Sequence, residues 1–172
     1  MKQVMVILIG LLCYNSYAQL SDAQINRLRY RVDSAASLLH ERLIAKSIPL
    51  LNTTFTVDTF KVEQLMKYKI SMDTSKSEYV SAINDAEIEY DLLLDKYYKL
   101  LLSMHDDDTR KSLAEAQKKW VEYRDDEIKT IEKFYAEQKN TNLKNKEVAK
   151  AKEHMELTKD RVVELFKHIL EN

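Results

Sequence analysis

Apolar side chains recur along most of this chain at intervals of three and four residues, which is the period of an amphipathic α-helix. Residues 47–57 are rich in β-branched side chains and form the only plausible extended segment, so we expect a connector there. Helices are predicted over about 21–48, 58–71, 75–104, 108–138 and 143–170. The pattern therefore predicts an all-α fold, an antiparallel helical bundle of about four to five helices with no β-sheet.

Polar residues mark where several of these helices begin. Ser21 and Ser75 each open a capping box, in which a serine and a Glu or Gln three residues later satisfy free backbone N–H groups. Asp106, Asp107 and Asp108 should supply an N-cap and an acidic first turn to the fourth helix. Since the turn before them is short, the third and fourth helices should fold back on each other as an antiparallel hairpin.

Three carboxylates share one face of the third helix, because Glu87, Asp91 and Asp95 are spaced four residues apart. Pairing across the hairpin keeps residue numbers summing to roughly 212. This register puts Asp91 beside Trp120 and Arg124. It puts Glu87 beside Arg124 and Asp125, and Asp95 beside Gln117.

Arg124 lies on the apolar stripe of the fourth helix, where a partly buried guanidinium needs a carboxylate partner. Asp91 and Glu87 are the candidates. Two interpretations of this network stay open: it fixes the register of the helices, or it shapes a binding surface.

The first residues have the pattern of a secretory signal. Lys2 supplies a positive charge, an apolar run follows to Cys13, and small residues precede a cleavage site after Ala18. The run is too short to span a bilayer, so no transmembrane anchor is expected. We expect residues 1–18 to be a signal peptide and the protein to be periplasmic or secreted.

Removal of this segment would leave no Cys and no Gly, because Cys13 and Gly10 are the only ones in the chain. Glycine-dependent phosphate loops, thiol catalysis and disulfides are then excluded. A net charge of −1 argues against nucleic-acid binding. The four His are scattered, so no metal site and no cofactor are predicted, and no catalytic residue can be assigned.

Three motifs resemble those of the LprI-like lysozyme inhibitor family. Asp91, Leu94, Asp95 and Tyr98 look like its D-x-x-L-N-x-x-Y motif, with Asp95 in place of the usual Asn. The middle motif, L-x-x-A-Q-x-x-W-x-x-[FY]-R-D-x-E, is matched from Leu113 to Glu127, and this match includes Gln117, Trp120, Tyr123, Arg124, Asp125 and Glu127. Thr158 and Arg161 belong to a segment similar to its closing L-T-x-x-R-x-x-E-L.

The resemblance covers roughly residues 78–166. Within this region the chain differs from the family in its cysteines. Family members usually carry Cys where this chain has approximately Ala82, Ile128 and a residue near Glu153. Residues 19–75 lie outside the resemblance and are expected to be an N-terminal helical extension. Residues 76–172 would then form the LprI-like helical domain.

The resemblance implies an exported binding protein, not an enzyme, that blocks a lysozyme-type muramidase. The alternative is a helical interaction module of the cell envelope that holds another protein. An undetected hydrolase would need a deep polar pocket with convergent carboxylates. For an inhibitor, the possible partner contact is the turn formed by Asp106, Asp107 and Asp108, whose charge could meet a basic enzyme surface.

Overall fold

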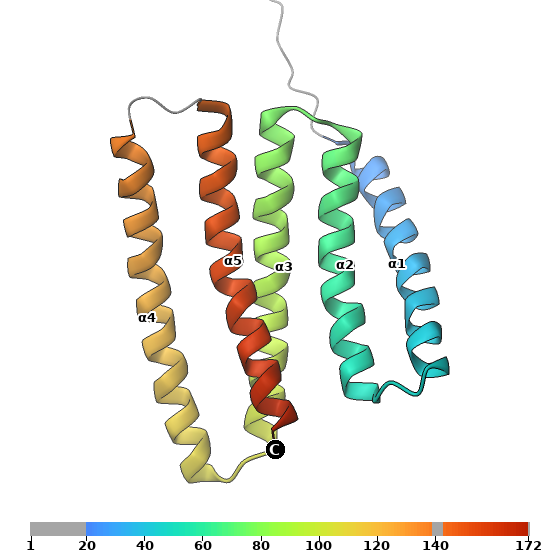
Figure 1. The fold of residues 1–172 in the computed structure, drawn as a ribbon, viewed down its shortest axis with the longest axis vertical. Coiled ribbons are helices and arrows are strands. Elements are labelled where there is room, and N and C mark those ends of the chain that lie inside the picture. Colours follow the sequence, from blue (N-terminus) through green and yellow to red (C-terminus); the bar gives the residue numbers. More distant parts are fainter. Residues whose placement is uncertain (1–19, 139–142, 172) are drawn as a thin grey trace, which may run out of the picture.

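A computed structural model describes residues 20–138 and 143–171, and its regular structure is entirely α-helical (Figure 1). The all-α prediction is confirmed, while the expected signal peptide lies outside the described residues. None of the described helices is both long and apolar enough to cross a membrane. The helices are α1 (Asp22–Ala45), α2 (Leu50–Met72), α3 (Lys76–Ser103), α4 (Asp107–Glu137) and α5 (Leu143–Leu170).

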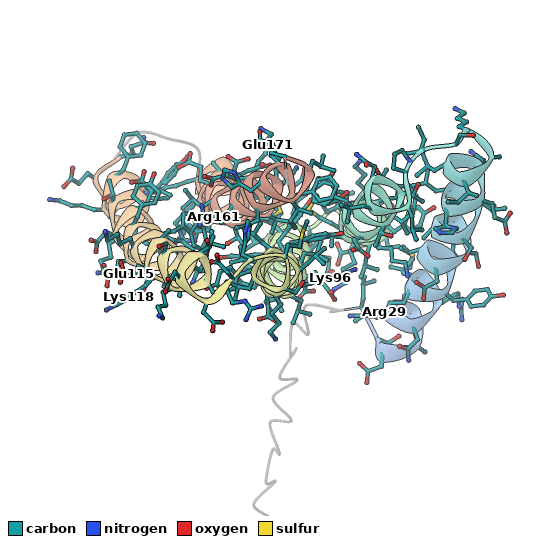
Figure 2. All side chains as sticks on the ribbon, turned by 90° about the horizontal axis from the view of Figure 1, so that it is seen from below. Arg29, Lys96, Glu115, Lys118, Arg161 and Glu171 are labelled. Carbon is teal, nitrogen blue, oxygen red and sulfur yellow. The ribbon has the colours of Figure 1, made fainter. Side chains whose placement is uncertain are left out.

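The helices lie side by side in the spatial order α4, α5, α3, α2, α1, which differs from their order in the chain (Figures 1 and 2). Consecutive helices run antiparallel, as predicted. The most extensive packing joins α3 to α5. These two helices are parallel because α4, which connects them in the sequence, runs in the opposite direction. Tyr90 lies near Lys159 and Tyr97 near Phe166, and this constant offset in residue number is the mark of parallel helices.

Apolar side chains of α3 and α5 form the centre of the core, and α2 closes it from one side. Phe55 of α2 stacks on Phe166 of α5, with ring centroids 3.8 Å apart and an angle of 8° between the planes. Both rings meet Tyr97 of α3 edge to face, at 5.2 and 5.6 Å. The helix α2, which precedes most of the region resembling the family, therefore shares its core.

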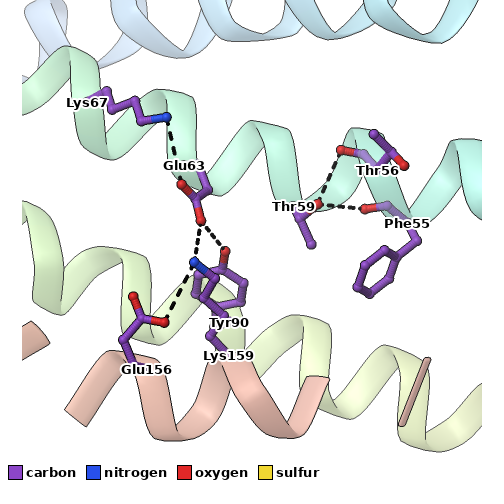
Figure 3. Close-up of polar contacts among 8 residues, drawn as sticks. All are labelled: Phe55, Thr56, Thr59, Glu63, Lys67, Tyr90, Glu156 and Lys159. Atoms are coloured by element: carbon purple, nitrogen blue, oxygen red, sulfur yellow. Dashed lines mark hydrogen bonds and ion pairs between the residues drawn. The ribbon is translucent and has the colours of Figure 1, made fainter. Parts of the chain in front are cut away.

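A polar contact joins the same three helices two turns further along (Figure 3). The Glu63 carboxylate of α2 accepts hydrogen bonds from Lys159 Nζ of α5 at 2.7 Å and from Tyr90 Oη of α3 at 3.0 Å. Burial opposes the charge of Glu63, but the Lys159 ammonium outweighs it and holds the pKa of the carboxyl below its ordinary value. Burial and the Glu63 charge raise the pKa of the Tyr90 phenol. Each of these three polar groups thus has a hydrogen-bond partner on a helix other than its own.

The predicted connector over 47–57 is wrong, because α2 already begins at Leu50. Pro49 occupies the N-cap position, where its missing N–H costs nothing, and its carbonyl accepts the Thr53 N–H at 2.9 Å. The hydroxyls of Thr54 and Thr56 donate to carbonyls four residues back, at 2.8 and 2.7 Å. Their β-branched side chains lower helix propensity only slightly, and burial of this segment against the core outweighs that cost.

The α1–α2 turn uses a residue with a side chain where glycine is the usual choice. Ser47 has φ of 57°, in the left-handed region. Its N–H donates to the Ile44 carbonyl at 2.9 Å, and the Ile48 N–H donates to the Leu43 carbonyl at 3.1 Å. This is a Schellman motif with Ser in the position that Gly normally fills.

The aromatic cluster gives a direct test of the core. Phe166→Ala should destabilise the protein by about 3–5 kcal/mol, because Phe166 is only 7% exposed and its loss leaves a cavity beside Phe55 and Tyr97. Phe134→Ala is the matched control, since Phe134 is 57% exposed, and it should change stability by about 0.5 kcal/mol or less. Urea unfolding followed by circular dichroism measures both; equal effects would contradict this account of the core.

Candidate functional site

Ile131 is the one buried residue of α4, and its inward face combines half-buried apolar side chains with polar contacts. The stripe of α4 that carries Arg124 faces the other helices and ends at Tyr135, whereas the neighbouring Phe134 is exposed. Apart from the buried Ile131, the residues of this stripe are half-buried: Leu113, Gln117, Trp120, Arg124, Ile128 and Tyr135. The position of α4 therefore depends both on these apolar side chains and on how its polar side chains meet α3 and α5.

Arg124 makes the contact with α3 that the sequence led us to expect. Its Nη1 donates to Asp91 Oδ1 at 2.9 Å, and its Nε lies 3.8 Å from Asp125 Oδ1. Among the described residues, Arg124 Nε has no hydrogen-bond partner although it is buried. The pair joins two helices that otherwise share few backbone contacts.

Arg161 makes the corresponding contact from α5. Its Nε and Nη2 both donate to Gln117 Oε1, at 3.1 and 3.0 Å, and its Nη1 donates to Glu164 at 2.8 Å. The Trp120 ring lies 5.2 Å from the Arg124 guanidinium and 5.6 Å from that of Arg161, within cation–π range of both. The middle and closing motifs thus meet around Trp120.

Asp95 and Gln117, which were expected to lie side by side, bind other partners. Asp95 is exposed and pairs with Lys99 on its own helix at 2.6 Å, while Gln117 faces Arg161. The helix α4 packs more on α5 than on α3, and Gln117 contacts Arg161 of α5.

Glu87 lies half-buried where α3, α4 and α5 meet. Burial raises its pKa above the ordinary value and Asp91 adds to this, while His154 and Arg124 act in the opposite direction. His154 Nε2 is buried and lies 3.9 Å from Glu132 Oε1 of α4. Sequence reasoning missed that His154 lies near Glu132, because only the packing of α5 on α4 brings these residues together.

The other motif residues divide between core and surface. Leu94 is buried, Tyr98 packs against the core, and Thr158 is fully buried with no hydrogen-bond partner for Oγ1 within the described chain. Tyr123 is 55% exposed, and Asp125 is exposed as well. Glu127 is half-buried beside a groove between α4 and α5. Most of the motif therefore holds helices together, and only part of it faces solvent.

The acidic turn lies at one end of the molecule, where α3 passes into α4 (Figure 1). Asp106 is the predicted N-cap and accepts the Thr109 N–H at 2.8 Å, which lowers the pKa of its carboxyl. Asp107 pairs with Arg110 at 3.1 Å and Asp108 with Lys111 at 3.0 Å. The side chains of Asp107 and Asp108 are 87% and 94% exposed, so both can reach a partner.

Within 20–138 and 143–171, no three His, Cys, Asp or Glu side chains gather in a group that could hold a metal ion.

The raised pKa of Glu87 predicts a pH-dependent stability effect. A folded pKa above the unfolded value of 4.5 favours the protonated form, so the ionised carboxylate costs stability as pH rises past that value. Glu87→Gln should therefore stabilise the protein near neutral pH by up to about 1 kcal/mol, since solvent screens a half-buried charge. The gain should shrink toward zero near about pH 4.

Urea unfolding at the two pH values measures this difference. Asp95→Asn is the control, because that carboxylate is exposed and paired locally, and it should show no such gain. A destabilised Glu87→Gln variant at neutral pH would mean that Arg124 and His154 dominate the site.

Residues 70–165 match the family model described as lysozyme inhibitor LprI. The match spans α3, α4 and most of α5, and it includes every motif residue whose contacts are described above. No curated protein and no solved structure matches the chain. Because the matched region covers more than half of the sequence, this protein belongs to the LprI lysozyme inhibitor family.

Proposed function

We propose that this protein is exported to the periplasm or the outside of the cell, where it binds a lysozyme-type muramidase and blocks it. The match to the LprI family model over residues 70–165 is the observation that carries this proposal. The signal-like pattern of the first residues supports export. The function needs no catalytic residue and no cofactor in this chain.

Enzymes of the lysozyme type cleave glycosidic bonds with two carboxyl groups that flank the scissile bond. An inhibitor has to fill the cleft that holds these groups or cover the approach to it. Most motif residues point inward and hold helices together, so the contact has to come from exposed side chains.

The turn formed by Asp106, Asp107 and Asp108 lies at one end of the molecule, where α3 passes into α4, so a partner can reach it (Figure 1). A muramidase acts on an anionic envelope surface, and positive charge on the enzyme would steer it there. Two highly exposed carboxylates at the turn complement such a surface. Their pairing with Arg110 and Lys111 holds them in place but also offsets part of their charge.

Purified residues 19–172 should slow the clearance of bacterial suspensions by at least one lysozyme of a panel. Replacing Asp106, Asp107 and Asp108 together with Ser should weaken inhibition by about 10-fold or more, because rim charges govern the encounter with an oppositely charged partner. Serine keeps the N-cap at position 106, so α4 should still begin correctly. The initial rate of turbidity loss is the measurement.

A matched control replaces three other exposed aspartates with Ser. Asp33, Asp95 and Asp126 each pair with a single Lys, so their removal changes the charge equally without touching the turn. This variant should inhibit like the unmodified protein. If the unmodified protein slows no lysozyme at micromolar excess, the inhibitor proposal fails and a different envelope protein becomes the partner to seek.

A further inference from the structure

A groove runs between α4 and α5, well away from the acidic turn. Ile131 of α4 and Ala149 and Leu157 of α5 supply its apolar surface. Its charged lining has four carboxylates, from Glu127, Glu153, Glu156 and Asp160, against the single ammonium of Lys152. The groove therefore combines an apolar floor with walls of one dominant charge.

These carboxylates are only partly neutralised by the protein itself. Within the described residues, Glu127 and Asp160 form no ion pair, and Glu153 accepts only the Tyr135 hydroxyl, at 2.6 Å. Glu156 differs because it lies 3.7 Å from Lys159. Three of the four acidic side chains thus keep a charge that a partner could meet.

The second large groove, between α1, α2 and α3, provides a useful contrast. It holds three acidic and two basic side chains, and every one of them forms an ion pair. Lys61 lies 2.8 Å from Asp33, and Arg29 lies 3.6 Å from Glu89. Charges that are already matched give little attraction for a partner, so the α4–α5 groove is the better docking surface.

By helical spacing, two exposed aromatic residues of α4 share a face with the groove residues Glu127 and Ile131. Tyr123 lies one turn before Glu127 and is 55% exposed, while Phe134 lies three residues after Ile131 and packs edge to face on Tyr135. Exposed Tyr and Phe beside a charged groove are the residue types that protein interfaces favour, and they can cover the stem of a long basic side chain.

We propose that the α4–α5 groove binds a cationic segment of the muramidase, with Lys or Arg side chains placed between Glu127, Glu153 and Asp160. This inference rests on the proposed function, because it names the part of the same partner that docks here. The groove anchors the enzyme, and the turn at Asp106–Asp108 reaches its cleft. Along α4 the two sites are about 30 Å apart, which one small domain can span.

The test measures the affinity of purified 19–172 for the same panel of lysozymes by calorimetry. The groove variant carries Glu127→Gln, Glu153→Gln and Asp160→Asn, which keep size and remove three charges. Glu156 is left intact because it contacts Lys159, which ties α5 to α2. The control variant carries Glu41→Gln, Glu115→Gln and Glu122→Gln, which are exposed and line neither the groove nor the turn.

The groove variant should bind about 10-fold or more weakly and with less dependence on salt, while the control stays within about twofold. Hydrogen exchange on the unmodified complex should show protection over 127–131 and 149–160, and this readout needs no variant. The groove proposal fails if the groove variant binds as tightly as the unmodified protein, if both variants lose affinity equally, or if protection is confined to other helices. The inhibitor proposal would stand in each of these cases. Absence of binding to every lysozyme in the panel would overturn both.

Discussion

The parallel contact between α3 and α5 is the constraint on which the rest of the structure depends. These helices are not neighbours in the chain, and α4 has to cross the length of the molecule before α5 can pack beside α3. Tyr90, Tyr97 and Leu101 of α3 and Val162 and Leu165 of α5 are almost fully buried. Once this seam has formed, α2 closes it through Phe55 and Glu63, and α4 attaches to its other side.

Much of the helical pattern could be predicted because each signal is local. The core stripe of α3 and the N-cap at Asp106 follow from the period of the apolar residues and from the chemistry of a helix start. The beginning of α2 could not be predicted in the same way. Its threonines favour extended structure by propensity, and only the burial of Thr53 and the stacking of Phe55 reverse that preference.

The polar contacts between α3, α4 and α5 could likewise be predicted only in part. A lone arginine on an apolar stripe pointed to Asp91, and the pair is present. Arg124 was also expected near Glu87. The partners of Gln117 and His154, and the closeness of His154 to Glu87, could not be found this way, because they depend on α5 lying closer to α4 than α3 does. The groove between α4 and α5 escaped sequence reasoning for this reason as well. The motif residue Glu127 lines it, but nothing local indicates that α5 supplies the opposite wall.

The side-by-side arrangement implies that stability is graded across the molecule. Each outer helix packs chiefly on one neighbour, α1 on α2 and α4 on α5, whereas α3 is covered from both sides. An outer helix can therefore open without disturbing the central seam, so its backbone amides will be the first to exchange with solvent. If muramidase binding uses α4, the ligand acts on a helix that is free to adjust, and occupancy will rigidify an edge that is otherwise the least restrained part of the fold.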